Sequence, residues 1–418
     1  MITKTITALL SISLLFLASC DVFDSTEDDP LMDQERKLSR QLTAQEQMAV
    51  DGSNDFAFLL LHQLQEKEEG ASFFVSPFSI TSAFGMTLNG AEGSTYEQMR
   101  DFFGYDGLTR DEINEAYRDL VELLVELDPQ VALNIANSIW IRENFDVKQD
   151  FIDTNRDYYN AEVRELDFAK EEAPDIINGW IEEETEGMID EMIDEIGPDV
   201  VMYLINAIYF QGDWTIQFDP EQTNDRPFHL EDGETTEVPL MSARDNFRHY
   251  FGDDWTALDM WYGDAGYSFT ALKPAGDNSL EEQISTFTDE DFETITENLT
   301  SDTVNVYVPK FELNYEIDNF KDELKDMGLT EPFSLRGADF SGINEDEPLA
   351  ISNVLHEAVI ELDEEGSEAA AATVIEMIRE VSVGGDSTPT IRLDQPFLFF
   401  IRENTTNTIL FMGVFTGK

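Results

Sequence analysis

The spacing of apolar and polar residues divides the chain into a helix-rich first half and a strand-rich second half. Residues 46–65 and 79–104 are predicted as helices, and a Ser-Pro pair opens the segment 76–91, which ends near Gly90. Runs of β-branched and aromatic residues predict strands. These runs are 131–142, 201–212 and 303–313. The last 22 residues contain two apolar runs around a polar turn, which predicts a β-hairpin. This order favours an α+β protein with large, mainly antiparallel sheets.

A late segment of the sequence fits neither a surface helix nor a loop. Apolar and polar residues nearly alternate over 350–362, as in a strand, and residues 363–387 follow. This second stretch contains four consecutive alanines and has two glycines, Gly384 and Gly385, near its end. A surface helix would carry more Leu, Lys and Glu, and a loop would carry more Gly, Pro and Asn. The segment is therefore compatible with more than one conformation.

The charge of the chain is extreme and excludes one class of partner. There are 88 acidic and 25 basic residues, for a net charge of -63, and the acidic residues are spread along all 418 positions. Nucleic-acid binding needs clustered Lys and Arg, so it is excluded. Such a chain repels itself at low ionic strength, and salt at about 1 M screens most of that repulsion. This favours a halophilic protein, the alternative being an ordinary acidic secreted one.

The N-terminus has the pattern of a targeting segment. Lys4 precedes an apolar run over 6–17, which is too short to span a bilayer. The sequence LASC that follows resembles a bacterial lipobox, so we interpret 1–19 as a lipoprotein signal peptide and Cys20 as the lipidated residue. Residues 20–45 are interpreted as an acidic, flexible tether. Cys20 is the only cysteine, which excludes an internal disulfide.

The sequence offers no pattern for catalysis or for a cofactor. The four histidines are His62, His229, His249 and His356, and none has a second histidine at the spacing of a zinc site. A nucleophile elbow is absent, and no cysteine remains for thiol chemistry. Residues 90–95 lack the lysine of a phosphate loop. We therefore expect no enzyme, no metal and no cofactor.

Eight sequence blocks, taken in order, resemble the serpin family from about residue 46 to 418. The blocks are FFVSPFSITSAFGMTLNGAEGSTYEQM (73–99), ANSIWI (136–141), INGWIEEETEGMI (177–189), LINAIYFQGDW (204–214), VYVPKFEL (306–313), ADFSGI (338–343), DEEGSEAAAAT (363–373) and RLDQPFLFFI (392–401). The resemblance implies a single domain, 46–418, with the serpin fold. That fold is α+β, with three β-sheets, about nine helices and an exposed reactive-centre loop, here about 364–390.

The resemblance also implies roles for individual residues. In inhibitory serpins the loop is a bait for a protease, and after cleavage it inserts into the main sheet as a new strand. The hinge that starts insertion corresponds to Glu364, Glu365, Gly366, Ser367, Ala369, Ala370, Ala371, Ala372 and Thr373. Positions of the shutter and breach, where the central strands part, correspond to Ser76, Ser79, Asn206, His356, Trp214 and Lys310. Lys310 and Glu364 are expected to form a salt bridge.

Small hinge residues favour an inhibitor, because nothing bulky obstructs an inserting strand. We therefore expect Ser367 to lie where the loop leaves the sheet, so that Ser367→Arg would block insertion with little effect on folding. Two departures from the family pattern are Met188, in place of a common Lys, and Ser367, in place of a common Thr.

The implied activity is inhibition of serine proteases, with cysteine proteases as a further class. The inhibitor is expected to be a monomer that forms a covalent acyl complex with its target. Counting from the hinge places the reactive bond at Glu380–Val381, with Arg379–Glu380 as the alternative. The expected location is outside the cytoplasmic membrane, held only by the lipid. The alternative function is a non-inhibitory serpin with a chaperone or binding role at the cell surface.

Overall fold

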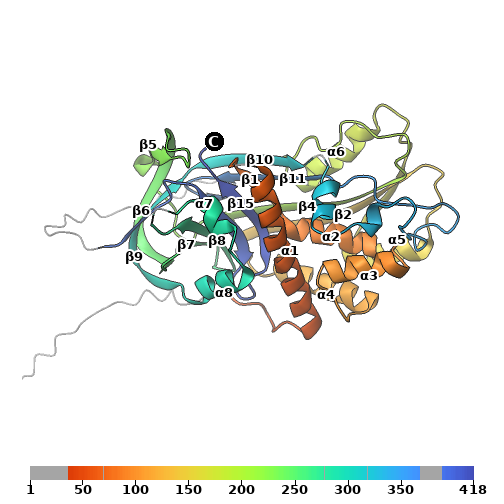
Figure 1. The fold of residues 1–418 in the computed structure, drawn as a ribbon, viewed down its shortest axis with the longest axis horizontal. Coiled ribbons are helices and arrows are strands. Elements are labelled where there is room, and N and C mark those ends of the chain that lie inside the picture. The colour runs from red at the N-terminus through yellow and green to blue at the C-terminus, as the bar shows by residue number, and fades with distance from the viewer. Residues whose placement is uncertain (1–35, 69, 277, 318, 368–387) are drawn as a thin grey trace, which may run out of the picture. The chain divides into compact units, whose positions relative to one another are not determined.

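The computed structural model describes residues 36–68, 70–276, 278–317, 319–367 and 388–418. The helices within these residues are α1 (Ala44–Glu68), α2 (Pro77–Leu88), α3 (Gly93–Phe102), α4 (Arg110–Val125), α5 (Gln149–Tyr159), α6 (Ala173–Glu184), α7 (Leu280–Ile284), α8 (Asp289–Glu297) and α9 (Lys321–Asp326). The strands are β1 (Phe73–Val75), β2 (Val131–Arg142), β3 (Glu162–Leu166), β4 (Met202–Asp213), β5 (Asn224–His229), β6 (Thr235–Phe251), β7 (Trp255–Tyr262), β8 (Tyr267–Pro274), β9 (Thr300–Pro309), β10 (Phe311–Ile317), β11 (His356–Leu362), β12 (Gly366–Ser367), β13 (Thr390–Arg392), β14 (Phe397–Glu403) and β15 (Ile409–Phe415). The α+β class and the helix number expected from the resemblance are confirmed (Figure 1).

The first predicted helix is confirmed as α1, but the second, over 79–104, is wrong in its continuity. The chain breaks into α2 and α3 around Gly90. Ser76 caps α2, since its Oγ accepts a hydrogen bond from the Ser79 backbone N–H. A Cβ added to Gly90 would lie 2.2 Å from the Ile343 side chain, so the break lies where another segment packs closely.

The strands hydrogen-bond into two sheets within the described residues, rather than the expected three. The nine-stranded sheet has the order β1-β15-β14-β8-β7-β6-β9-β13, and β5 pairs with β6. Strand β6 is long enough to pair with β5, β9 and β7 along successive parts of its length. It therefore joins what would otherwise be two separate sheets. The C-terminal hairpin is confirmed as β14 and β15.

The six-stranded sheet has the order β10-β11-β12-β4-β2-β3. The predicted strand 303–313 is in fact two strands in different sheets, β9 and β10, because the chain changes direction at Lys310. Of the alternating stretch 350–362, only the last seven residues form a strand, β11. The first residues of the expected loop form β12, which lies between β11 and β4.

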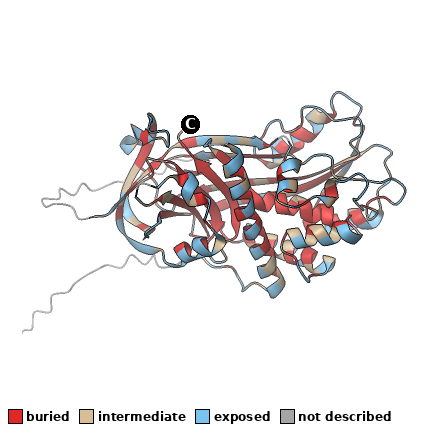
Figure 2. Ribbon diagram, in the orientation of Figure 1, coloured by how far each residue is buried: buried red, intermediate tan, exposed pale blue. Residues whose placement is uncertain are grey.

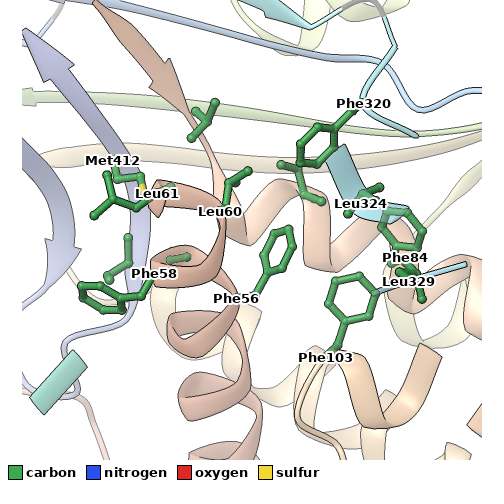
Figure 3. Close-up of a cluster of buried hydrophobic side chains, with 14 of the residues drawn as sticks. Phe56, Phe58, Leu60, Leu61, Phe84, Phe103, Phe320, Leu324, Leu329 and Met412 are labelled. Carbon is green, nitrogen blue, oxygen red and sulfur yellow. The ribbon is translucent and has the colours of Figure 1, made fainter. Parts of the chain in front are cut away.

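Helices α1 and α2 cross the space between the sheets and carry the largest core. Figure 3 shows Leu61 of α1 beside Met412 of β15. Phe56 of α1 lies near Phe103, which directly follows α3, and Phe84 of α2 and Leu324 of α9 belong to the same cluster. In Figure 2 the hairpin strands β14 and β15 and most of α2 are buried, whereas α1 is buried on one side only. This packing fixes α2 beneath the six-stranded sheet.

The described end of the predicted tether is packed on the domain. The Arg36 side chain donates to Asp264, its backbone N–H donates to the Ala265 carbonyl, and Leu38 is 9% exposed within a hydrophobic cluster. Arg40 forms an ion pair with Glu46, at the start of α1. The interpretation of 20–45 as flexible is therefore wrong for residues 36–43.

Candidate functional site: the opening of the six-stranded sheet

The chain leaves β11 through a tight turn and re-enters the same sheet at once. The Asp363 carboxylate accepts hydrogen bonds from the backbone N–H groups of Glu365, at 2.8 Å, and Gly366, at 3.2 Å. Ser367 then pairs with Leu362 of β11 on one side and Gly212 of β4 on the other. The predicted hinge thus begins as a strand that is already inserted between β11 and β4.

Gly366 is required at this position because the backbones approach closely. A Cβ added there would lie 2.1 Å from the Gly212 carbonyl oxygen and 2.8 Å from the Asp213 Cα. Both are backbone atoms of β4, which cannot move aside as a flexible side chain can. The glycine therefore allows β12 to approach β4, in addition to the backbone freedom inferred from sequence.

Ser367 is the last described residue of β12 and is buried, which contradicts the expectation that Ser367→Arg would have little effect on folding. The residue is 3% exposed, and its hydroxyl lies 2.6 Å from the Tyr262 hydroxyl. Burial raises the pKa of Tyr262, and the hydrogen bond from Ser367 opposes that rise. Because the hydroxyl pair is enclosed, Ser367→Arg would place an arginine in the folded core before any protease acts.

The expected salt bridge between Lys310 and Glu364 is present. The Lys310 Nζ lies 2.7 Å from Glu364 Oε2 and 3.8 Å from Asp363 Oδ2, and the Thr223 hydroxyl donates to Glu364 at 2.6 Å. Hydrogen bonding to Glu364 raises the pKa of Lys310. Burial disfavours the Glu364 anion, but hydrogen bonds from Lys310 and Thr223 outweigh burial and lower its pKa. Both groups are therefore charged at neutral pH.

Trp214, which directly follows β4, forms hydrogen bonds with the same turn. Its indole N–H donates to the Asp363 carbonyl at 2.8 Å, and its backbone N–H donates to the Glu365 carbonyl at 2.7 Å. Its ring stacks on Tyr262, with centroids 4.4 Å apart. Trp214 and Lys310 thus hold the turn 363–366 from opposite sides.

The predicted shutter residues come together farther down the sheet, next to α2. His356 of β11 accepts a hydrogen bond at Nε2 from the Ser76 backbone N–H, at 3.0 Å. An acceptor nitrogen carries no proton, so the ring is neutral, and burial lowers the pKa of His356 to about 4. The Ser79 hydroxyl donates to the Asn206 carbonyl of β4, at 3.3 Å. Helix α2 therefore contacts both strands that flank the hinge.

A narrow cavity of about 30 Å³ continues from Ser367 between β4 and β11. This is room for about one or two water molecules. Its lining consists of Phe74, Thr185, Met188, Ile189, Ile208, Tyr209, Phe210, Val359, Ile360, Glu361, Ser367, Ile401 and Phe411. In the described residues β4 pairs with β12 and β2, and β11 pairs with β12 and β10. The cavity therefore lies at the end of the short inserted strand.

Several predicted residues lie outside the described part of the chain. They are Cys20, Ala369, Ala370, Ala371, Ala372, Thr373, Arg379, Glu380 and Val381. Conversely, sequence reasoning missed Tyr262, Thr223 and Asn137, whose amide oxygen accepts from the Asn206 side chain at 2.9 Å. Tyr262 and Thr223 lie outside every matching block, and no local pattern marks them. Asn137 lies inside the block 136–141, which was a usable signal.

The described residues contain no group of three or more His, Cys, Asp or Glu side chains arranged to hold a metal ion. No helix among them has the length and apolar character needed to cross a membrane.

The fold and the inserted hinge are those of a serpin, and comparisons with known proteins agree with this assignment. A family profile described as "Serpin (serine protease inhibitor)" matches residues 51–417. A serpin-like protein of Methanosarcina acetivorans is 34% identical over 368 residues, covering 86% of this chain and 84% of that protein. Rat alpha-1-antiproteinase is 33% identical, covering 86% of both chains. The crystal structure of tengpin, a thermophilic serpin in its native state, superposes with a TM-score of 0.80 at 28% identity, covering 93% of this chain and 99% of tengpin. The chain belongs to the serpin family, whose members are generally protease inhibitors.

Proposed function

We propose that this serpin inhibits serine proteases as a suicide substrate. The observation that carries the proposal is the hinge, with Gly366 and Ser367 paired between β11 and β4 above a narrow cavity. A strand that has started to insert needs only to lengthen. After Glu368, residues 369–372 are alanines, which add little volume and no charge.

The chemistry is supplied by the protease, and the inhibitor supplies a trap. The protease serine attacks the carbonyl carbon of a loop residue, forms an ester, and releases the next residue as a new amino terminus. Insertion of the loop as a strand then adds backbone hydrogen bonds to both β11 and β4. The trap succeeds when insertion is faster than hydrolysis of the ester.

The reactive bond we propose is Glu380–Val381, with Arg379–Glu380 as the alternative. The first bond suits glutamyl-specific or elastase-like enzymes, and the second suits trypsin-like enzymes. Incubation with a panel of these proteases is expected to give a complex that survives boiling in detergent. For the first bond the released C-terminal peptide has 38 residues, 381–418, and sequencing its amino terminus identifies the bond.

Digestion of the loop by every active protease in the panel, without any stable complex, would contradict inhibition. A non-inhibitory serpin with a chaperone or binding role would then be the better account. A protease whose active-site serine is replaced by alanine provides the control, because it can bind the loop but cannot form the ester.

We further propose that the protein is exported and held at the membrane by lipid on Cys20. Support comes from the sequence, in which the only cysteine follows Leu-Ala-Ser after a short apolar run. Expression with a radiolabelled fatty acid is expected to label the wild-type protein and not Cys20→Ser. Equal labelling of the two would contradict the anchor.

A further inference from the structure

Three arginines lie on one face of the nine-stranded sheet, around a tyrosine. The guanidinium carbon of Arg392 lies 3.7 Å from the centre of the Tyr307 ring, and that of Arg226 lies 5.1 Å from it. Tyr307 pairs with Arg392 of β13 and with Ser242 of β6, and the next cross-strand pair on that face joins Asn305 to Arg244. We call Arg226, Arg244, Tyr307 and Arg392 the arginine face.

The arginine face brings two arginines without an ion pair together on one ring, in a chain that is rich in carboxylates. With 88 acidic residues available, other arginines such as Arg36, Arg40 and Arg402 have carboxylate partners. In the described part of the structure neither Arg226 nor Arg392 is in an ion pair. The Nε atom of Arg226 is buried and donates to no group there. A ring contact orients these guanidinium groups without neutralising them.

The arginine face lies beside the point where the loop rejoins the sheet. Arg244 donates to the Thr388 hydroxyl at 2.9 Å, and Arg392 ends β13 four residues later. Val381 lies seven positions before Thr388, a span of at most about 25 Å when extended. A protease domain of about 230 residues has a radius of gyration of roughly 17 Å. An enzyme bound at the intact Glu380–Val381 bond, before cleavage, must therefore lie close to this face.

We propose that the arginine face is a docking surface for acidic residues of the target protease. The inference rests on the proposed function and names a second contact, separate from the reactive bond. Guanidinium groups bind carboxylates in a planar, paired geometry, and steering by such charges acts on the association rate. In a protein of net charge -63 a local basic surface also offsets the general repulsion of an acidic enzyme.

The test uses one protease in two surface forms. The protease is the one that the wild type traps among trypsin, elastase and glutamyl endopeptidase. It is used as purified and after succinylation, which converts surface ammonium groups into carboxylates. We expect Arg226→Gln/Arg392→Gln to lower the second-order inhibition rate constant about tenfold with the succinylated enzyme. With the unmodified enzyme the change should stay within about twofold, and the number of inhibitor molecules used per protease should not change.

The matched control is Arg156→Gln/Arg336→Gln, which changes the net charge equally. In the described residues neither arginine is in an ion pair, and both are exposed. Arg156 belongs to α5, which Figure 1 places at the opposite end of the domain from β5 and β9. A second variant, Arg226→Lys/Arg392→Lys, retains the positive charges and should keep at least half of the wild-type rate.

Equal rates for the glutamine variant and the wild type, or an equal loss in the control, would overturn the docking proposal alone. Failure of the wild type to trap any protease would overturn the proposed function and the docking proposal with it. Thermal melts of all variants show whether a loss of rate comes from a loss of folding. If the glutamine variant is unfolded, the rate of the lysine variant tests the docking proposal instead. A lysine variant as slow as the glutamine variant would also count against docking.

Discussion

Arginine at position 369 should convert the inhibitor into a substrate, whereas the same side chain at position 368 should not. Antiparallel extension of the observed register pairs position 369 with Phe210 of β4 and Ile360 of β11. Both are buried and line the cavity below Ser367. Position 368 would pair with Gln211 and Glu361, whose side chains are on the other side of the sheet and are not buried. The two variants therefore differ in which face receives the charge.

The magnitude follows from the size and lining of the cavity. A volume of about 30 Å³ cannot hold a guanidinium group with its stem, and the lining residues nearest to position 369 are apolar. Burying an unpaired charge costs several kcal/mol. A rise of only about 1.4 kcal/mol in the barrier to insertion slows that step tenfold. Because hydrolysis of the ester continues at its own rate, Ala369→Arg should consume about ten or more inhibitor molecules for each protease trapped.

The assay is a titration of residual protease activity against inhibitor concentration, for wild type, Ala369→Arg and Glu368→Arg side by side in high salt. Gel electrophoresis should show cleaved, uncomplexed Ala369→Arg with the same new amino terminus as wild type. Glu368→Arg should keep a stoichiometry near that of wild type. Equal stoichiometries for all three proteins would refute insertion beyond Ser367 in the observed register.

Four further outcomes are expected from melting experiments. Gly366→Ala should lower stability by about 1–3 kcal/mol through the clash with β4, whereas Gly179→Ala, with open space around it in α6, should not lower it. Leu38→Ala should cost about 2 kcal/mol if residues 36–43 are held as described, and an unchanged melting temperature would contradict that packing. Stability should rise steeply between about 0.1 M and 1 M salt, and a flat dependence would contradict the halophilic interpretation. The pKa of His356 is about 4 in the folded chain and 6.5 without burial, so the unfolded chain binds a proton at a higher pH than the folded chain does. Stability should therefore fall as the pH is lowered from 6.5 to 4, by up to about 3 kcal/mol. His356→Gln should remove this part of the pH dependence, and an unaltered pH profile would contradict it.

The family, the α+β class and the positions of most strands could be predicted because they depend on local patterns. The strand 201–212 and the hairpin of β14 and β15 have continuous apolar and β-branched runs. Lys310 could also be assigned a partner, Glu364, because the family motif carries both residues. These features depend on short stretches of sequence, which can be recognised without knowing what packs against them.

The errors arose where distant segments meet. Nothing near Ser367 in the sequence indicates that its hydroxyl group forms a hydrogen bond with Tyr262, over one hundred positions earlier. Similarly, the break at Gly90 depends on Ile343, and the third sheet disappears only because β6 is long enough to pair with three strands. Residue patterns report which face of an element is apolar, but they do not report what lies against that face.

The hinge shows how the overall charge bears on the insertion of β12. Asp213 of β4 lies beside the turn, and burial, together with the charges of Glu365 and Asp363, raises its pKa. The turn thus gathers four carboxylates, counting Glu364, and the Lys310 ammonium group lies near two of them, Glu364 and Asp363. Repulsion among them favours expulsion of β12 from the sheet, while the backbone pairing of Ser367 and the Lys310 ion pair oppose it. Salt weakens the repulsion of the exposed groups more than it weakens the hydrogen bonds, because screening acts on charges in contact with solvent. High salt should therefore favour the inserted hinge, and the wild-type hinge should be withdrawn from the sheet more often as salt is removed.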